Sequence, residues 1–359
     1  MRIGVLLDPY GEQFQSGLGR VVNELVQALI TQGREYSFLL YHKPLPEGTV
    51  SFTGNNWETR SLKSRSVWRA APSVFERGTD IFLFLTPAIP IFFFPRRSVV
   101  VVHDCAHFEL RAKSVRGTLM RQLLYFMYAQ SFRKATSIVA VSEATQAAVE
   151  RYFPHTRGKV TAIANGFTSL PRGGTDVAIQ EPFFLFYGVL KPRKNVLAII
   201  EAFALIADTH PQHLLVISGK AKGSYFDQLL ELVRDRGIES RVRFIGYAND
   251  EVVGCLLARA EGLVFPSLLE GFGMPVLEAM AFGCPVITSN EGALAEVGGT
   301  AALLVDPSDP QSIASAMRRL ADDPSLRTEL SGKGKERAQL FSWDRAARSY
   351  LALLRAYTV

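Results

Sequence analysis

Short apolar runs separated by amphipathic stretches recur along the whole chain. In the first half these runs predict strands at 2–8, 37–41, 81–85, 99–103 and 138–142, and a strand-like alternation continues over 159–166. Valine and leucine at 22, 25, 26 and 29 have the three- and four-residue spacing of one helix face. Buried strands that alternate with helices are typical of a parallel α/β sheet.

The same alternation resumes after residues 171–175, where proline and glycines interrupt the apolar runs. Strands are predicted at 183–187, 214–218, 242–245, 262–265, 286–288 and 303–305, with helices between them. Amphipathic helices follow at 311–321 and 344–357. The chain of 359 residues exceeds the usual size of one domain. We therefore expect two α/β domains, 1–170 and 171–340, followed by a last helical segment, 341–359.

The segment 265–290 carries the most informative pattern. An apolar strand leads into a loop, 268–273, and then into a helix that we expect to start at Pro275 and to stop at Gly283. The N–H groups at a helix start favour phosphate. Glu270 lies on the loop, where it would repel phosphate and makes a poor N-cap, and Glu278 lies one turn inside the helix. A row of hydroxyls suits Glu270 better, and a polyol joined to a phosphate is a sugar nucleotide.

Glu270-x7-Glu278 within FPSLLEGFGMPVLEAMAFGCPVI resembles the hallmark of the retaining GT-B glycosyltransferases called glycosyltransferase group 1, or family 4-like. The resemblance implies two Rossmann-like domains that face each other across a cleft. The first would shape the acceptor site, the second would bind the donor, and the last helix would cross back to the first domain near 341–343. Glu270 would orient sugar hydroxyls and Glu278 the ribose. The implied donor-binding residues between them are Gly271, Phe272, Gly273, Met274 and Pro275.

Gly17-Leu18-Gly19 follows the first predicted strand, and we expect it to form a loop with two glycines. It resembles the glycine loop in the first domain of this family, which implies that Gly17 and Gly19 approach the donor phosphate or the acceptor. Ser16 departs from the glycine of many members. A tight strand-to-helix connection is the alternative. The sequence is not a full GxGxxG, which argues against a dinucleotide cofactor.

His103 ends the predicted strand 99–103, on the ligand side of a parallel sheet. A neutral imidazole could donate a hydrogen bond to a sugar hydroxyl, and an imidazolium could pair with phosphate. A core histidine bonded to backbone is the alternative. The Val-Val-His-Asp string resembles the His motif of the family, which implies contact with the donor sugar.

The segment YGVLKPRKN, 187–195, places clustered cations after a strand and a glycine, Gly188. Arginine and lysine complement the oxygens of a diphosphate. The resemblance assigns this role to Arg193 and Lys194, with Lys191 as an alternative and a solvated basic turn as the other interpretation. Near the end of another predicted strand, the resemblance makes Tyr247 a lining residue of the nucleobase site.

Charge and composition limit the classes of binding partner that the chain is expected to have. The net charge of +6 and the pI near 9.2 suit nucleotide diphosphates or acidic lipid surfaces, while no nucleic-acid motif is present. The three cysteines form no CxxC pair, which is typical of reduced thiols in the cytoplasm. The N-terminus resembles a strand rather than a signal peptide. Because no Asp-x-Asp or metal-ligand cluster occurs, we expect neither a metal nor another cofactor.

Two segments bear on the acceptor. Residues 81–94, IFLFLTPAIPIFFF, suit a core strand with a buried loop, or a surface that touches lipid. Residues 111–134 mix arginine and lysine with leucine, phenylalanine and methionine, as in a helix that lies on an anionic membrane or one that simply packs. The predicted location is cytoplasmic, with peripheral contact at the inner face of the plasma membrane left open.

The sequence thus predicts a retaining, metal-independent hexosyltransferase in cell-surface polysaccharide or lipid-linked oligosaccharide assembly, with mannose slightly ahead of glucose. The alternatives are a sugar-nucleotide epimerase of the same fold and a non-catalytic nucleotide-sugar-binding scaffold. A phosphorylase would need pyridoxal phosphate, which nothing in the sequence indicates.

Overall fold

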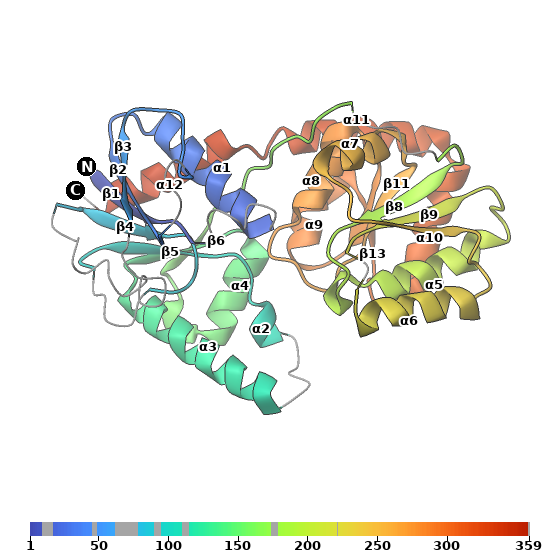
Figure 1. Cartoon of the computed structure of the whole chain (residues 1–359), viewed down its shortest axis with the longest axis horizontal. Helices are drawn as coiled ribbons and strands as arrows, with labels where there is room; N and C mark the ends of the chain where they lie inside the picture. The colour runs from blue at the N-terminus through green and yellow to red at the C-terminus, as the bar shows by residue number, and fades with distance from the viewer. Residues whose placement is uncertain are drawn as a thin grey trace. The chain divides into compact units, whose positions relative to one another are not determined.

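The structure is a computed structural model that describes residues 1–8, 17–44, 49–61, 78–89, 95–109, 115–173, 179–220 and 222–357. Predicted features at Ser16, 90–94, 111–114 and 174–175 lie outside these ranges. The chain divides into two compact units (Figure 1). Unit 1 comprises Met1–Gly166 and Phe341–Val359, and unit 2 comprises Phe167–Leu340.

The sheet of unit 1 is parallel, with the strand order β3-β2-β1-β4-β5-β6-β7. Its inner strands consist almost entirely of buried apolar residues, as expected of a sheet covered by helices on both faces. The strands are β1 (Arg2–Leu6), β2 (Ser37–His42), β3 (Trp57–Ser61), β4 (Ile81–Phe84), β5 (Ser98–Val102), β6 (Ser137–Ala140) and β7 (Val160–Ala162).

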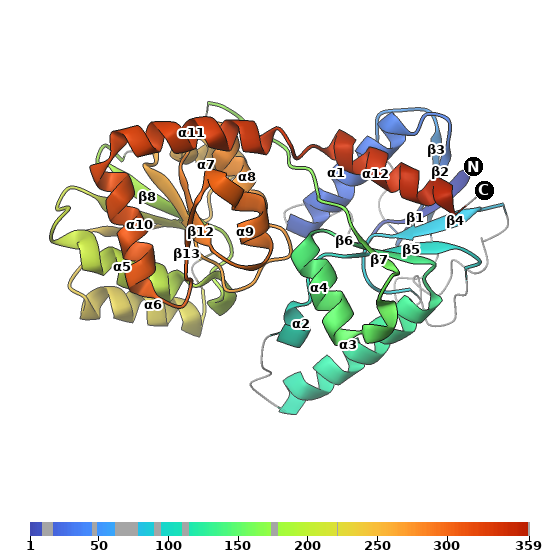
Figure 2. The ribbon, with the colours of Figure 1, turned by 180° about the vertical axis from the view of Figure 1, so that it is seen from behind.

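Helices of unit 1 cover this sheet, and the last of them comes from the far end of the chain. Figure 2 shows α12 beside α1, and the Arg348 guanidinium donates to Gln32 Oε1 at 3.3 Å. A Cβ on Gly166 would lie 2.2 Å from the backbone nitrogen of Trp343, so only glycine permits this approach. The helices are α1 (Gly17–Gln32), α2 (Ala106–Glu109), α3 (Val115–Lys134), α4 (Glu143–Tyr152) and α12 (Trp343–Ala356), with the 3-10 turn η2 (Pro154–Thr156).

The sheet of unit 2 is also parallel and repeats the topology, with the order β10-β9-β8-β11-β12-β13. Its strands are β8 (Phe183–Tyr187), β9 (Leu214–Ser218), β10 (Val242–Gly246), β11 (Gly262–Phe265), β12 (Val286–Ser289) and β13 (Leu303–Val305). Its helices are α5 (Val196–Ala207), α6 (Ser224–Asp235), α7 (Asp250–Arg259), α8 (Met274–Phe282), α9 (Gly292–Gly298), α10 (Pro310–Asp322) and α11 (Pro324–Ala338), with η3 (Pro192–Lys194) and η4 (Gly299–Ala301).

Each sheet reverses its strand order once, between β1 and β4 in unit 1 and between β8 and β11 in unit 2. Ligands of such sheets bind outside the carboxyl ends of the strands at this switch point, because the two flanking loops diverge there. In unit 2 the loop after β8 contains Arg193 and Lys194, and the loop after β11 contains Glu270.

The predicted α/β class with two Rossmann-like domains is confirmed, and the differences are local. Gly17 and Gly19 lie in the first turn of α1 rather than in a loop, so the predicted loop over 15–20 was wrong from residue 17 on. Helix α8 begins at Met274, one residue before the predicted start, and ends as predicted at Gly283, whose φ is 76°. Residues 81–85 are buried core. No helix in the described part of the chain is both long and apolar enough to cross a bilayer.

Candidate active site

Two cations and one carboxylate join the loops at the switch point of unit 2. Arg193 Nη1 donates to Glu270 Oε2 at 3.1 Å and to the carbonyl of Leu269 at 2.9 Å. Lys194 Nζ forms an ion pair with Glu270 Oε1 and lies 4.8 Å from the centre of the Phe265 ring. The side chains of Lys194 and Glu270 are only 11% and 10% exposed. A charged trio this poorly hydrated carries one net positive charge at the carboxyl edge of the sheet.

Backbone and amide hydrogen bonds hold the same two loops together. The N–H of Leu268 donates to the carbonyl of Arg193 at 2.8 Å. Asn195 Nδ2 donates to the carbonyls of Pro266 and Pro307 at 3.1 and 2.6 Å, so this residue also ties in the loop after β13. Asn195 has φ 63°, a conformation that asparagine tolerates better than most residues. The sequence analysis assigned no role to Asn195. An asparagine directly before a predicted helix could have indicated a residue with positive φ at this junction.

The start of α8 forms the other side of this site. Gly273 has φ 115°, and a Cβ there would lie 2.7 Å from Leu294 Cδ2. Any other residue would therefore be both strained and crowded. Met274 and Pro275 begin the first helical turn, in which Pro275 has no N–H and the Val276 N–H donates to the Gly273 carbonyl at 3.0 Å. Phe272 is buried, and its neighbour Gly271 completes the loop that brings Glu270 to the helix start.

Glu278 is buried four residues into α8 and has a specific partner. The Tyr187 hydroxyl donates to Glu278 Oε2 at 2.6 Å and lies 3.2 Å from the carbonyl oxygen of Pro275. Tyr187 ends β8, so this bond links the central strand to the helix start. Sequence reasoning quoted Tyr187 only as the end of a strand. The contact spans 91 positions of sequence and had no local signal.

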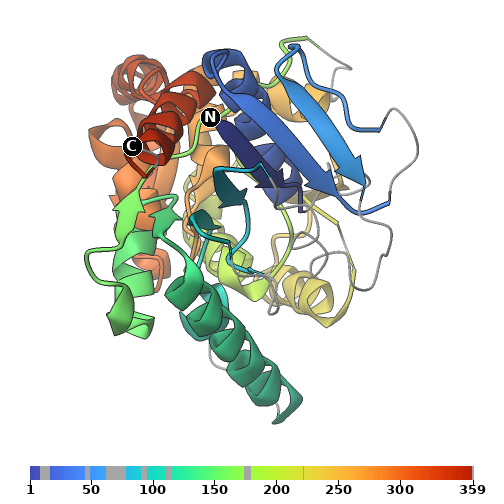
Figure 3. The same cartoon turned by 90° about the vertical axis from the view of Figure 1, so that its left-hand side faces the viewer.

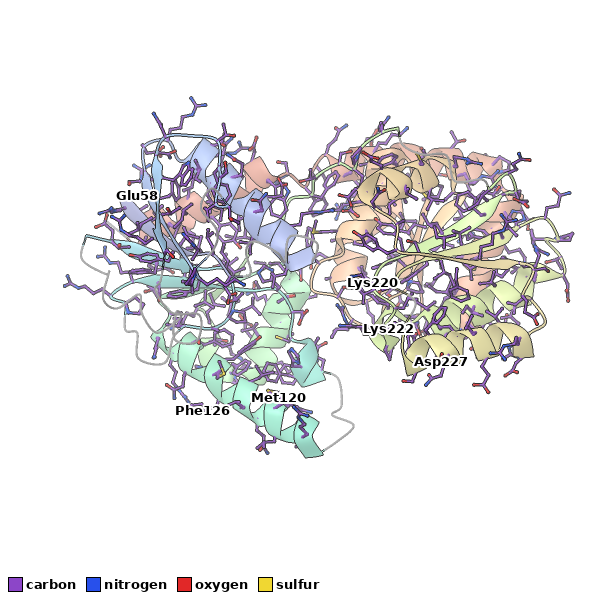
Figure 4. The ribbon with its side chains drawn as sticks, in the orientation of Figure 1. Glu58, Met120, Phe126, Lys220, Lys222 and Asp227 are labelled. Atoms are coloured by element: carbon purple, nitrogen blue, oxygen red, sulfur yellow. The ribbon has the colours of Figure 1, made fainter. Side chains whose placement is uncertain are left out.

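Glycines and an exposed aromatic residue mark the neighbouring strand ends. Gly188 has φ 145°, and a Cβ on Gly219 would lie 2.3 Å from the Gly188 carbonyl oxygen. Tyr247 follows β10 and is 59% exposed, with Lys220 Nζ 5.7 Å from its ring centre. Figure 4 shows Lys220 and Lys222 on the connection between β9 and α6. An open aromatic face beside a cation is suited to stacking of a flat ring.

His103 follows β5 in unit 1 and lies beside the end of β4. Its Nε2 lies 2.8 Å from the carbonyl oxygen of Leu85, which can only accept, so Nε2 carries the proton. Burial lowers the pKa of His103, although the Leu85 carbonyl and Asp104 raise it in part. The neutral ring therefore presents Nδ1 as an acceptor. The predicted donation to a sugar hydroxyl needs the opposite tautomer, and the predicted imidazolium is disfavoured by burial.

The predicted residues thus group by unit. Unit 2 brings Arg193, Lys194 and Glu270 together and joins Glu278 to β8, while Lys191 is exposed on the same turn. In unit 1, Gly17 and Gly19 supply first-turn backbone at the carboxyl end of β1. A Cβ on Gly17 would meet nothing within 4 Å. Within the described ranges, no group of three or more His, Cys, Asp or Glu side chains lies close enough to hold a metal ion.

Two Rossmann-like units of the same strand order, one with cations and carboxylates at a helix start, define the class of GT-B glycosyltransferases. The chain matches the family described as Glycosyl transferases group 1 over residues 175–337 and Glycosyltransferase Family 4 over residues 15–168. It therefore belongs to the group 1, or family 4, glycosyltransferases, whose members retain the configuration of the transferred sugar.

One relative supports this membership across most of both chains. The chain is 32% identical over 272 residues to the O-antigen chain mannosyltransferase B of Escherichia coli, covering 71% of this chain and 70% of that protein. Other matching mannosyltransferases of the same organism are longer, and the chain spans only about a third of their length.

Solved structures agree with the fold. Sucrose-phosphate synthase from Thermosynechococcus elongatus superposes with a TM-score of 0.77 at 22% identity, covering 99% of this chain and 98% of that one. The Anabaena protein HepE, solved in complex with UDP and glucose, gives a TM-score of 0.73 at 20% identity, covering 99% and 100%. At these identities the likeness concerns the fold alone.

Proposed function

We propose that the chain transfers a mannosyl residue from a nucleotide diphosphate sugar to a glycan or lipid-linked acceptor hydroxyl in cytoplasmic assembly of surface polysaccharide. The observation that carries this proposal is the trio Arg193, Lys194 and Glu270 beside the start of α8. Similarity to an O-antigen mannosyltransferase supports mannose over glucose. Unit 2 is the proposed donor domain and unit 1 the proposed acceptor domain.

The proposed chemistry follows from where charge develops. When the glycosidic C–O bond breaks, positive charge grows on the sugar ring and negative charge on the β-phosphate. Arg193, Lys194 and the positive end of the α8 dipole stabilise the leaving phosphate, because they are held in place before the reaction begins. These groups supply the charge that a bridging metal would otherwise supply, so transfer is proposed to proceed without one.

The carboxylates are proposed to orient the donor. Glu270 is paired with both cations, which holds its oxygens in place, and it is proposed to accept hydrogen bonds from the sugar hydroxyls next to the diphosphate. Glu278, held by Tyr187, is proposed to accept from the ribose hydroxyls. In unit 1, Nδ1 of the neutral His103 is proposed to accept a hydrogen bond from a sugar hydroxyl. Gly17 and Gly19 are proposed to offer backbone N–H groups, and Tyr247 a face for the nucleobase.

The first test is calorimetric titration of the chain with GDP, UDP, ADP and dTDP in the presence of a chelator. We expect one nucleotide to bind in the micromolar range, and binding to be lost in Lys194→Ala. Lys191→Ala is the matched control, because Lys191 is an exposed cation on the same turn. The absence of binding by every nucleotide would contradict the proposal and favour a scaffold role.

The second test is transfer itself. With the sugar donor of the preferred nucleotide, we expect product of retained anomeric configuration, seen by nuclear magnetic resonance. Lys194→Ala should reduce kcat roughly 30- to 1000-fold, which corresponds to about 2 to 4 kcal/mol in the barrier. Full activity of Lys194→Ala, or a strict need for added divalent metal, would contradict the proposed mechanism.

A further inference from the structure

Helix α3 of unit 1 exposes an unusual number of large apolar side chains. Eleven large hydrophobic residues are exposed in the described part of the chain. Five of these eleven lie inside α3, in a stretch of eight positions. Figure 3 shows the first turns of this helix extending past the sheet of unit 1. The five are Leu119 (66% exposed), Met120 (50%), Leu123 (52%), Tyr125 (45%) and Phe126 (54%).

The opposite face of α3 already accounts for the packing of the helix. Tyr128 and Phe132 are anchored in an aromatic cluster, with ring centres 5.4 Å from Phe108 and 5.0 Å from Phe153 respectively. Ala129 is buried on the same side. Folding of unit 1 therefore explains the inner face and leaves the outer face unexplained.

Four of the exposed residues share that outer face. Leu119, Leu123 and Phe126 follow each other at spacings of four and three, and Met120 lies beside them. Figure 4 marks Met120 and Phe126 on α3. The solvent side of a helix in a soluble protein is normally polar, whereas this one is apolar on both sides. We name Leu119, Met120, Leu123 and Phe126 the outer stripe.

The charges of α3 indicate what the outer stripe meets. The helix has four basic residues and no acidic one: Arg116, Arg121, Arg133 and Lys134. Lys159 adds a further cation near its C-terminal end, where its Nζ donates to the carbonyl of Phe132 at 2.8 Å. Burial lowers the pKa of the nearby His155, and the like charges of Arg133 and Lys159 lower it further. Pairing of two copies through this stripe would bring α3 arginines together with no acidic residue on either helix to neutralise them.

We propose that the outer stripe of α3 is a docking surface for an anionic lipid bilayer. The helix lies in the interface with the stripe among the acyl chains, and Arg116 and Arg133, which share its face, lie at the anionic headgroups. The outer stripe takes up positions 119–126, about 12 Å of helix, and would provide this contact without crossing the bilayer. The docking goes beyond the proposed glycosyl transfer and does not depend on it.

The test is vesicle flotation of the full chain with phosphatidylcholine alone and with phosphatidylcholine mixed with phosphatidylglycerol. We expect binding to the mixed vesicles, weakened by salt, and little binding to the neutral ones. Leu123→Ser with Phe126→Ser should weaken binding more than tenfold. Arg116→Gln with Arg133→Gln should weaken it roughly 25-fold, at about fivefold per arginine. All four side chains lie on one helix and none belongs to the proposed donor site.

Matched controls use similar changes elsewhere. Leu205→Ser with Leu304→Ser alters leucines that are 43% and 42% exposed in unit 2, and Arg234→Gln with Arg236→Gln removes two exposed arginines. Both should leave vesicle binding unchanged, and nucleotide binding and melting temperature should be unchanged in all four variants. Absence of wild-type flotation would overturn the proposal, as would flotation that the α3 changes do not affect. Dimers in light scattering that only the α3 changes dissolve would assign the stripe to self-association instead.

Discussion

The two units share a strand order, but different side chains lie at the point where that order reverses. In unit 2 the loops after β8 and β11 are joined by two ion pairs to one carboxylate, with side chains that are mostly withdrawn from water. In unit 1 the ends of β4 and β5 are joined by a hydrogen bond from the neutral imidazole of His103 to the carbonyl of Leu85. Charged groups at low exposure favour an anionic ligand, whereas a neutral hydrogen-bond acceptor favours hydroxyls. The same topology therefore suits a diphosphate in one unit and a sugar in the other.

The largest effect should come from removing the carboxylate of unit 2. Glu270→Gln keeps the shape but removes the negative charge that pairs with Lys194 and Arg193, so we expect the free energy of unfolding to fall by about 3 kcal/mol. Added nucleotide diphosphate should restore much of this loss, because it supplies the missing negative charge, and its Kd should not rise.

Thermal melts with and without nucleotide measure both effects, and transfer assays should show about a 100-fold loss of kcat. Glu291→Gln, at an exposed glutamate on the same unit, is the control. A variant that is as stable as wild type, or that binds nucleotide much more weakly, would show that the trio is not an anion site waiting for its ligand.

An effect of intermediate size on stability is expected at Tyr187 but not at Tyr350, the two tyrosines compared next. Tyr187→Phe in unit 2 removes the hydroxyl that donates to buried Glu278, which should cost about 1 to 3 kcal/mol of stability and weaken nucleotide binding. Tyr350→Phe in unit 1 removes a buried hydroxyl that has no partner in the described structure, so we expect stability to stay equal or rise.

Chemical denaturation of the two variants gives the stability, and titration with a 2′-deoxynucleotide diphosphate tests the ribose contact. Tyr187→Phe should lose less affinity for the deoxynucleotide than for the ribonucleotide. Equal losses for both would remove the proposed link between Glu278 and the ribose.

The smallest effect concerns His103. Burial lowers its pKa below the ordinary 6.5, so as pH falls through 6.5 the unfolded chain takes up the proton before the folded chain does. Stability should therefore fall on acidification, at a rate of at most about 1.4 kcal/mol per pH unit for one proton.

His103→Gln, which can still donate to Leu85, should flatten this decline between pH 7 and 5. His107→Gln changes an exposed histidine on the neighbouring turn and should leave the slope near that of wild type. Denaturation midpoints measured across pH decide the matter, and an unchanged slope in His103→Gln would contradict the neutral, buried imidazole.

Sequence pattern predicted most of the fold because the inner strands are apolar runs that water disfavours. The elements it missed lack that pattern. Strand β3 is an edge strand of sequence WETRS, and α11 includes the polar run SGKGKERA, whose two glycines weaken a helical prediction. The loop residues Glu270 and Arg193 were identified from local motifs. Their ion pair was not, because 77 positions separate them and only the packed sheet places the two loops together.

The return of the chain at Phe341 has a consequence for biosynthesis. Helix α12 completes unit 1, yet the ribosome makes it only after every residue of unit 2. The part of α1 that α12 covers therefore stays exposed to solvent while the whole of the second unit is synthesised and folds. A chain cut after Leu340 would keep that face bare permanently. We expect cellular proteases to remove such a fragment even though its second unit could fold.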